Sequence, residues 1–546
     1  MTRTARFALL LAALPLAHAH ADGHRGGTMR LLANASAGTL DPQINYTTQF
    51  WQIEQAAYDG LLGFKKVDGA AGNTIVPDLA EAVPQPTDDG KTYVLKLRTG
   101  VKFSNGADVT VDDVVATFKR IFAVSSPTAG TFYNGIVGAD VCLKTPAGCA
   151  LPGVVGDAKA ATITFHLTDP DSEFLYKLAV QHALIVPAGS PQTDAGVTAL
   201  PGTGPYMISA YDPKAEMKLV RNPYFKQWNA DAQPDGYPDQ IVYDFGQSNE
   251  AEITAVQNGQ ADWTFDSPPG DRLGELGQKY GKQVHLSPET TIWYAPMNVN
   301  QPPFDKLDVR TAVNDAIDRR ALANLFGGFK VATPACQTLP PGIPGYQAYC
   351  PFGTNPGATW SAPDMAKAKA LVQKSGTAGQ KVTVISDDGA VASSIGTYLV
   401  SVLNAIGYQA TLHTLSTDIE FTYIQNTNNH TQISVTLWTQ DYPLASDFLN
   451  LMYSCASFHP GSDTSVNMSG YCDKALDARM QQAMTLSQTD QAGADKIWSE
   501  VDRTVTDKSL AAVMFVPKQV SFVSTRIGNF LFSPQDNWII DQAWVQ

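Results

Sequence analysis

Residues 77–120 constrain the fold of this chain more than any other segment. In the run 93–98, Tyr93, Leu95 and Leu97 alternate with Val94, Lys96 and Arg98, which is the period of a strand. Asn105-Gly106 is a turn pair. Thr110 then precedes two aspartates and an apolar helical run, so a helix should begin there with acidic residues at the positive end of its dipole. The segment therefore predicts a strand, a turn and a helix in that order.

Residues 1–21 predict an export signal. Arg3 and Arg6 form a basic start, residues 7–16 are apolar, and small residues at 17–21 offer a cleavage site. The apolar stretch is too short to span a bilayer, and no cysteine lies near it to carry a lipid anchor. We therefore expect an exported protein of the periplasm without a lipid anchor; the alternative is an uncleaved signal anchor.

Length and charge limit the classes of partner. Loss of residues 1–21 would leave 525 of the 546 residues, enough for two to four domains, and would change the formal net charge from −14 to −16. So acidic a chain repels nucleic acid and anionic lipid, and we expect neither as a partner. The same charge slightly favours neutral or cationic ligands.

All six cysteines lie beyond the predicted signal. An even number in an exported chain predicts disulfides, although six cysteines permit 15 pairings. Pairing of sequence neighbours would close three short loops and stabilise the fold by about 2–3 kcal/mol each. The favoured pairs are Cys142–Cys149, Cys336–Cys350 and Cys455–Cys472. The rival interpretation, a metal site, lacks any CxxC or Cys-His ligand spacing.

Periodicity and turn residues predict the remaining elements. Helices are expected at residues 50–62, 250–259, 309–325, 364–375, 393–406, 473–486 and 491–506. Strands are expected at residues 28–32, 162–167, 207–209, 217–221, 241–245, 297–300, 382–385, 433–438 and 511–516. This alternation is typical of a mixed α/β protein.

The block 77–120 resembles the hallmark segment of the periplasmic solute-binding proteins of the peptide/nickel class, which serve ABC transporters. Further pieces of the resemblance follow in chain order at residues 40–42, 58–62, 203–206, 221–224, 303–305, 309–310 and 316–319. The resemblance implies an α/β fold of periplasmic binding protein type II, with two mixed α/β lobes, a hinge and an extra inserted domain. The implied parts are lobe I (22–65, 190–293 and 515–546), inserted lobe II (66–189) and lobe III (294–514). Hinge closure would enclose the ligand between lobes I and III.

The sharpest candidate for a binding site follows the expected strand 433–437, where open α/β lobes bind ligands. It consists of Trp438, Thr439, Gln440, Asp441 and Tyr442. A carboxylate beside aromatic rings suits a primary amine, because it accepts a charge-assisted hydrogen bond where the rings exclude water. The resemblance implies that Asp441, in a Trp-x-x-Asp arrangement, anchors a peptide's α-amino group. The alternative is an Asx turn before Pro443.

Two further loops are candidates for ligand contacts. The resemblance implies that Tyr46, Thr47 and Thr48 supply hydroxyl and backbone groups from lobe I; an ordinary surface loop is the equal alternative. After the strand 382–385, dipeptide binders often carry an arginine for the ligand carboxylate, whereas this chain has Asp387-Asp388. Asp388 is therefore a candidate contact for a cationic ligand group, unless the pair is only a solvated turn.

The sequence offers no enzyme motif: HExxH, GxSxG and GxGxxG are absent, and Gly90-Lys91-Thr92 lacks the glycine that a P-loop needs. We therefore expect a receptor, not an enzyme, without cofactor or metal. The protein would act as a monomer. It would capture a peptide or peptide-like amine and deliver this ligand to an inner-membrane ABC permease. The alternatives are a nickel chelate, haem, an opine or another cationic ligand on the same fold, and less favourably a periplasmic hydrolase.

Overall fold

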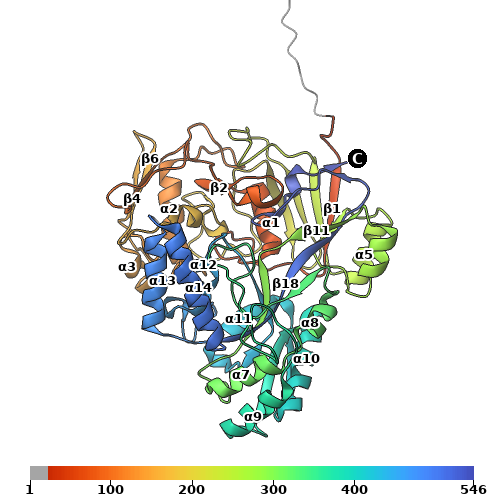
Figure 1. The fold of residues 1–546 in the computed structure, drawn as a ribbon. Helices are drawn as coiled ribbons and strands as arrows, with labels where there is room; N and C mark the ends of the chain where they lie inside the picture. Colours follow the sequence, from red (N-terminus) through yellow and green to blue (C-terminus); the bar gives the residue numbers. More distant parts are fainter. Residues whose placement is uncertain (1–22, 488) are drawn as a thin grey trace, which may run out of the picture.

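The computed structural model describes residues 23–487 and 489–546 (Figure 1). The predicted signal, residues 1–21, lies outside the described residues. Within the described part, no helix has the length and apolar character needed to cross a membrane. The chain folds into several mixed sheets with helices packed on them, which confirms the predicted α/β class.

The first mixed sheet has the order β10-β1-β9-β8-β7, with β1 parallel to both neighbours. Its strands are β1 (Thr28–Ala33), β7 (Tyr206–Asp212), β8 (Glu216–Arg221), β9 (Gln240–Phe245) and β10 (Trp263–Thr264). The helices packed on it are α1 (Thr48–Ala57), α5 (Asn249–Gln257) and α6 (Leu273–Lys279). Trp538 lies in the same core as Met29, so the two ends of the described chain share one hydrophobic cluster.

A smaller antiparallel sheet, β4-β6-β5, carries the strand–turn–helix block. It consists of β4 (Thr92–Lys96), β5 (Val154–Asp157) and β6 (Thr162–His166), with α2 (Val111–Ala123), α3 (Ala139–Lys144) and α4 (Phe174–Lys177) around it. The predicted helix start is confirmed: Asp113 N–H donates to Thr110 Oγ1, and Thr110 N–H donates to Asp113 Oδ2 at 2.8 Å. The two bonds satisfy amide groups that the first turn of a helix leaves unpaired. β2 (Leu62–Phe64) and β3 (Ile75–Pro77) form a separate hairpin beside it.

The third sheet, β15-β14-β16, is parallel and has helices packed against it. Its strands are β14 (Lys381–Asp387), β15 (Gln409–Leu415) and β16 (Ile433–Ser434). The helices around it are α7 (Leu307–Ala316), α8 (Arg319–Phe326), α9 (Met365–Ser375), α10 (Ala390–Ile406) and α11 (Thr417–Gln425). Asp364 caps α9, and Gly376 ends it in the left-handed conformation.

A long antiparallel strand connects the first and third regions. β18 (Ala511–Phe522) pairs with β12 (Thr291–Pro296) through its first half and with β11 (Val284–Pro288) through its second half. β17 (Thr436–Thr439) and β13 (Ala332–Pro334) complete this sheet. Met514 of β18 is buried among the helices of the third region, whereas Phe522 is buried with α5 and α6. β18 therefore runs from one core to the other (Figure 1).

The late helices pack against the β4-β6-β5 region (Figure 1). They are α12 (Ala445–Tyr453), α13 (Lys474–Leu486) and α14 (Gln491–Asp507). One hydrophobic cluster joins Phe165 of β6 to Phe448 of α12 and Trp498 of α14. The chain ends in short pairs, β19 (Ile527–Gly528) with β22 (Trp544–Val545) and β20 (Phe532–Ser533) with β21 (Asn537–Trp538). The lobe boundaries stay a prediction.

Two helix predictions are wrong in their extent. The helix expected at 50–62 ends at Ala57. Tyr58 has an extended backbone conformation, and residues 62–64 form strand β2, which pairs with β3. The helix expected at 309–325 is two helices. Ile317 is extended, and Asp318 caps α8 by accepting from Arg320 N–H at 2.9 Å.

Two strand predictions are also wrong. The strand expected at 297–300 lies earlier, at Thr291–Pro296, and Asn298 instead accepts from Asn300 N–H in a turn. The strand expected at 433–438 divides at Val435. Its first part pairs with β14 and its second part with β12, so the two halves belong to different sheets.

The predicted disulfide pairing is confirmed. Cys142–Cys149, Cys336–Cys350 and Cys455–Cys472 are bonded, with Cα–Cα separations of 5.1, 5.2 and 4.5 Å. Each separation lies in the ordinary range for a disulfide. Each bond closes a loop of fewer than 20 residues, so each lowers the conformational entropy of only a short segment of the unfolded chain.

Candidate ligand-binding site

A cavity of about 320 Å³ lies where the separate regions meet. Its walls come from the loop before α1, from residues 180–182, from β14 and α11, from β17 with the loop after it, and from residues near β21. This volume is at the lower end of the range for small-molecule sites. The cavity therefore suits a ligand of the size of a short peptide.

Asp441 lies at the centre of the hydrogen bonds around this cavity. Tyr46 OH donates to its Oδ2, and Gln535 Nε2 donates to its main-chain carbonyl. The Asp441 N–H donates to Oδ2 of Asp447, in the first turn of α12, at 2.9 Å. Tyr46 thus holds the carboxylate, and Gln535 and Asp447 hold the main chain of Asp441 just after β17.

The electrostatics of this cluster favour a cationic partner. Burial raises the pKa of Asp441 to about 6, although hydrogen bonds with Tyr46 and Asp447 lower it in part. Burial and the neighbouring Asp441 raise the pKa of Asp447 well above its ordinary value. Burial also raises the pKa of the Tyr46 phenol, so its hydroxyl keeps the proton that it donates. At neutral pH the Asp441 carboxylate is the charged member, and a ligand ammonium would compensate it.

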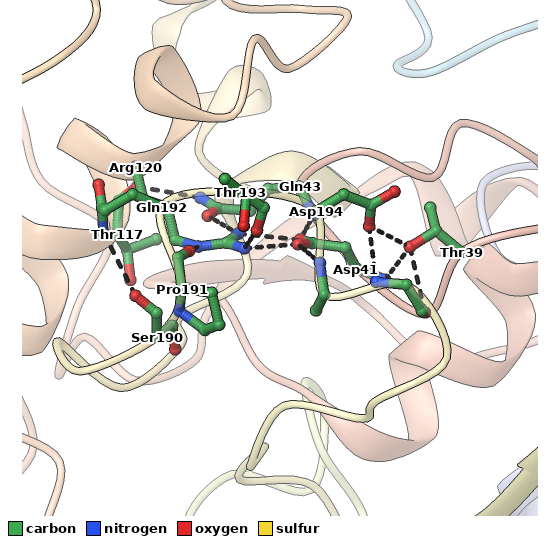
Figure 2. A network of polar contacts seen from close by, with 12 residues as sticks. Thr39, Asp41, Gln43, Thr117, Arg120, Ser190, Pro191, Gln192, Thr193 and Asp194 are labelled. Atoms are coloured by element: carbon green, nitrogen blue, oxygen red, sulfur yellow. Dashed lines mark hydrogen bonds and ion pairs between the residues drawn. The ribbon is translucent and has the colours of Figure 1, made fainter.

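A buried ion pair positions the loop that carries Tyr46 (Figure 2). Arg120 Nη1 donates to Asp41 Oδ1 at 2.9 Å and to Gln43 Oε1 at 2.7 Å, and Nη2 donates to Asp41 Oδ2. The same guanidinium donates to the main-chain carbonyls of Pro191 and Thr193. Asp41 also accepts from the amides of residues 43 and 195. Charge and hydrogen-bonding capacity are therefore satisfied on both partners.

His182 continues this scaffold to the cavity wall. Its Nε2 donates to the Asn45 carbonyl at 3.0 Å, and Thr128 Oγ1 donates to Nδ1 at 2.8 Å. The ring lies 5.0 Å from that of Tyr46, and Trp438 lies 6.1 Å from Tyr46 on another side. Burial lowers the pKa of His182 to about 4, so the ring is neutral at pH 7. Its role in this arrangement is to hold the loop, not to add charge.

Most of the predicted site residues are brought together. Those that line the cavity are Tyr46, Thr47, Thr48, Trp438, Thr439, Gln440 and Asp441. Tyr442 lies behind this wall and packs against Phe132, with ring centroids 5.5 Å apart. Asp388 is not part of the lining: its Oδ1 accepts from Thr417 N–H and Oγ1 at the start of α11.

Sequence reasoning missed two acidic residues of the lining, Asp387 and Glu420. Asp387 is the neighbour of Asp388, which the sequence analysis proposed as a ligand contact. Only the direction of β14 decides which of the two side chains faces the cavity. Glu420 had no sequence signal, because α11 itself was not predicted. Among the described residues, no group of three or more His, Cys, Asp or Glu side chains is arranged to hold a metal ion.

Comparisons with known proteins agree with this architecture. The family model described as "Bacterial extracellular solute-binding proteins, family 5 Middle" matches residues 74–460. Glutathione-binding protein GsiB of Salmonella typhimurium is 26% identical over 519 residues, which cover 92% of this chain and 92% of that protein.

Two solved structures share the fold. The ABC transporter-associated periplasmic binding protein DppA of Helicobacter pylori, in complex with peptide STSA, has a TM-score of 0.81 at 18% identity, covering 96% of this chain and 99% of that chain. The murein tripeptide binding protein MppA of Escherichia coli has a TM-score of 0.78 at 20% identity, covering 95% of this chain and 98% of that chain. They confirm the predicted type II periplasmic binding protein fold.

The family match extends over more than half of the chain and includes α2, the cavity segments from β14 to β17, and Asp441. The family match confirms the prediction of a binding protein and contradicts the alternative of a periplasmic hydrolase. With the fold, the cavity and the match in agreement, the chain belongs to family 5 of the bacterial extracellular solute-binding proteins.

Proposed function

We propose that this protein is the periplasmic receptor of an ABC importer and that it captures a short peptide or peptide-like amine. The observation that carries the proposal is the Asp441 carboxylate, which is half-buried in the cavity wall and held by Tyr46. A ligand α-ammonium would meet both its charge and its geometry. The names of relatives that bind glutathione or the peptide STSA support a ligand of this size and class. The chain would work as a monomer, without a lipid anchor, and pass its ligand to an inner-membrane permease.

One observation favours a second candidate, a small cationic amine that is not a peptide. Among the described residues that line the cavity there is no lysine or arginine, and His182 is neutral at pH 7. A free peptide C-terminus would therefore meet only neutral donors. A ligand without a carboxylate avoids that cost.

Mass spectrometry of small molecules released by denaturation would test the proposal. The protein would be purified from periplasm without added ligand, and a matched sample would be dialysed under partial denaturation as a blank. Short peptides in the released fraction support the proposal. A single non-peptide amine supports the second candidate, whereas an anionic or uncharged compound contradicts both.

Affinity for an amine-bearing peptide without basic side chains should depend on pH. Below about pH 6, Asp441 takes up a proton and the affinity should fall by about tenfold per pH unit. Above about pH 8, the peptide's own α-amino group loses its proton, and the affinity should fall again. The ionisable groups around Asp441 are Tyr46, Asp447 and Tyr133, all with raised pKa values, and the two phenols stay protonated across this window.

Isothermal titration calorimetry from pH 5 to pH 9 would measure this profile. An N-acetylated form of the same peptide is the matched control, because it has no ammonium to pair with Asp441. A flat profile for the free amine would contradict the assigned pairing.

A further inference from the structure

A second acidic region lies in the same cavity, away from the Asp441 hydrogen bonds. Asp387 ends β14, and Glu420 lies on α11; both line the cavity. Glu420 is only 4% exposed, yet its Oε1 has no hydrogen-bond partner among the described residues. Oε1 of Gln440, also in the lining, is unpartnered in the same way. Buried acceptors without donors are costly, and both of these belong to residues of the cavity lining.

Among the described residues, no cationic side chain forms an ion pair with Glu420, and its Oε1 has no hydrogen-bond partner. The buried carboxylate of Asp41, in the loop before α1, is paired with Arg120. By contrast, the charged neighbour that acts on Glu420 is Asp387, and together with burial it raises the pKa of Glu420 to about 8. Burial raises the pKa of Asp387 to about 6, with a further contribution from Asp388. Burial, together with Tyr453 and Glu420, raises the pKa of Tyr294 on β12, so its phenol is neutral. The groups facing Glu420 are thus acidic or uncharged.

We propose that Asp387 and Glu420 form a second cation subsite, so that the preferred ligand is a short peptide with a lysine or arginine side chain. The α-ammonium would bind at Asp441, and the side-chain ammonium or guanidinium would donate to the carboxylates of Glu420 and Asp387. The proposal rests on the function proposed above and specifies its ligand class. It also explains why the cavity lining has several carboxyl groups and no cationic side chain among its described residues.

Pairs of tripeptides test this subsite. Each pair differs only by lysine or norleucine, which has the same aliphatic stem without the ammonium, and the pair is tried at each of the three positions. Calorimetry should show that, at one position, the lysine peptide binds at least about tenfold more tightly. Glu420→Gln should remove that advantage and leave the norleucine peptide within about threefold of its wild-type affinity.

Two further variants complete the design. Glu500→Gln removes an exposed carboxylate on α14 that pairs with Arg479 at the surface, and it should leave both affinities unchanged. Asp387→Asn provides a second route to the subsite if Glu420→Gln is poorly folded. Equal binding of lysine and norleucine peptides at every position overturns the subsite but leaves the amine receptor intact. Failure of every amine-bearing peptide to bind overturns the proposed function, and the subsite with it.

Discussion

Asp441→Asn is expected to weaken binding of an amine-bearing peptide by about 2–5 kcal/mol, or about 30-fold or more in Kd. The substitution keeps the size of the side chain and its ability to accept from Tyr46 OH, but it removes the charge. A ligand ammonium would then be buried against a neutral amide. Isothermal titration calorimetry on wild type and variant, with the same peptide, would measure the loss.

The comparison needs a control that separates charge from shape. N-acetylation of the peptide removes the ammonium from the other side of the contact. If the two groups pair, acetylation should cost much in wild type and little in Asp441→Asn, because the interaction is already lost. A loss of less than threefold for Asp441→Asn, or equal costs of acetylation in both proteins, would rule out Asp441 as the anchor.

Tyr46→Phe provides a graded second variant. It removes the hydroxyl that donates to Asp441 Oδ2 but leaves the carboxylate. The charge remains available to the ligand, so the loss of affinity should be smaller than for Asp441→Asn. The two substitutions should not be additive, because they act on one hydrogen-bonded unit.

Local chemistry made parts of this structure predictable. The helix start at Thr110 is confirmed because its two capping hydrogen bonds join residues three positions apart. The disulfides join cysteines 7, 14 and 17 residues apart, so sequence proximity was a sound guide to pairing. Trp438 to Asp441 were found because they end and follow an apolar run that is extended in the structure.

Other features depended on contacts that no local pattern records. The segment 433–438 is uniformly strand-like, but its division at Val435 is imposed by two different partner strands. Asp41 and Arg120 are separated by 79 positions, and no local pattern predicts that they pair. Glu420 is one acidic residue among many in the chain, and only the packing of α11 makes it part of the cavity.

Arg120→Met is expected to lower the free energy of unfolding by about 3–5 kcal/mol. Arg120 is 2% exposed and Asp41 is fully buried, so the variant leaves a carboxylate without its cation and several carbonyls without donors (Figure 2). A loss of this size is a large fraction of the stability of a typical domain. Urea unfolding followed by tryptophan fluorescence would measure it.

Arg479→Met is the matched control, because Arg479 pairs with Glu500 at the surface and its loss should cost at most about 1 kcal/mol. The double variant Asp41→Asn with Arg120→Met should recover part of the lost stability, since it removes the unpaired buried charge. Ligand affinity should fall in Arg120→Met even under conditions where it is folded, because the loop from Asp41 to Tyr46 loses its main support. A cost below about 1 kcal/mol together with unchanged affinity would show that the ion pair neither stabilises the fold nor positions Tyr46.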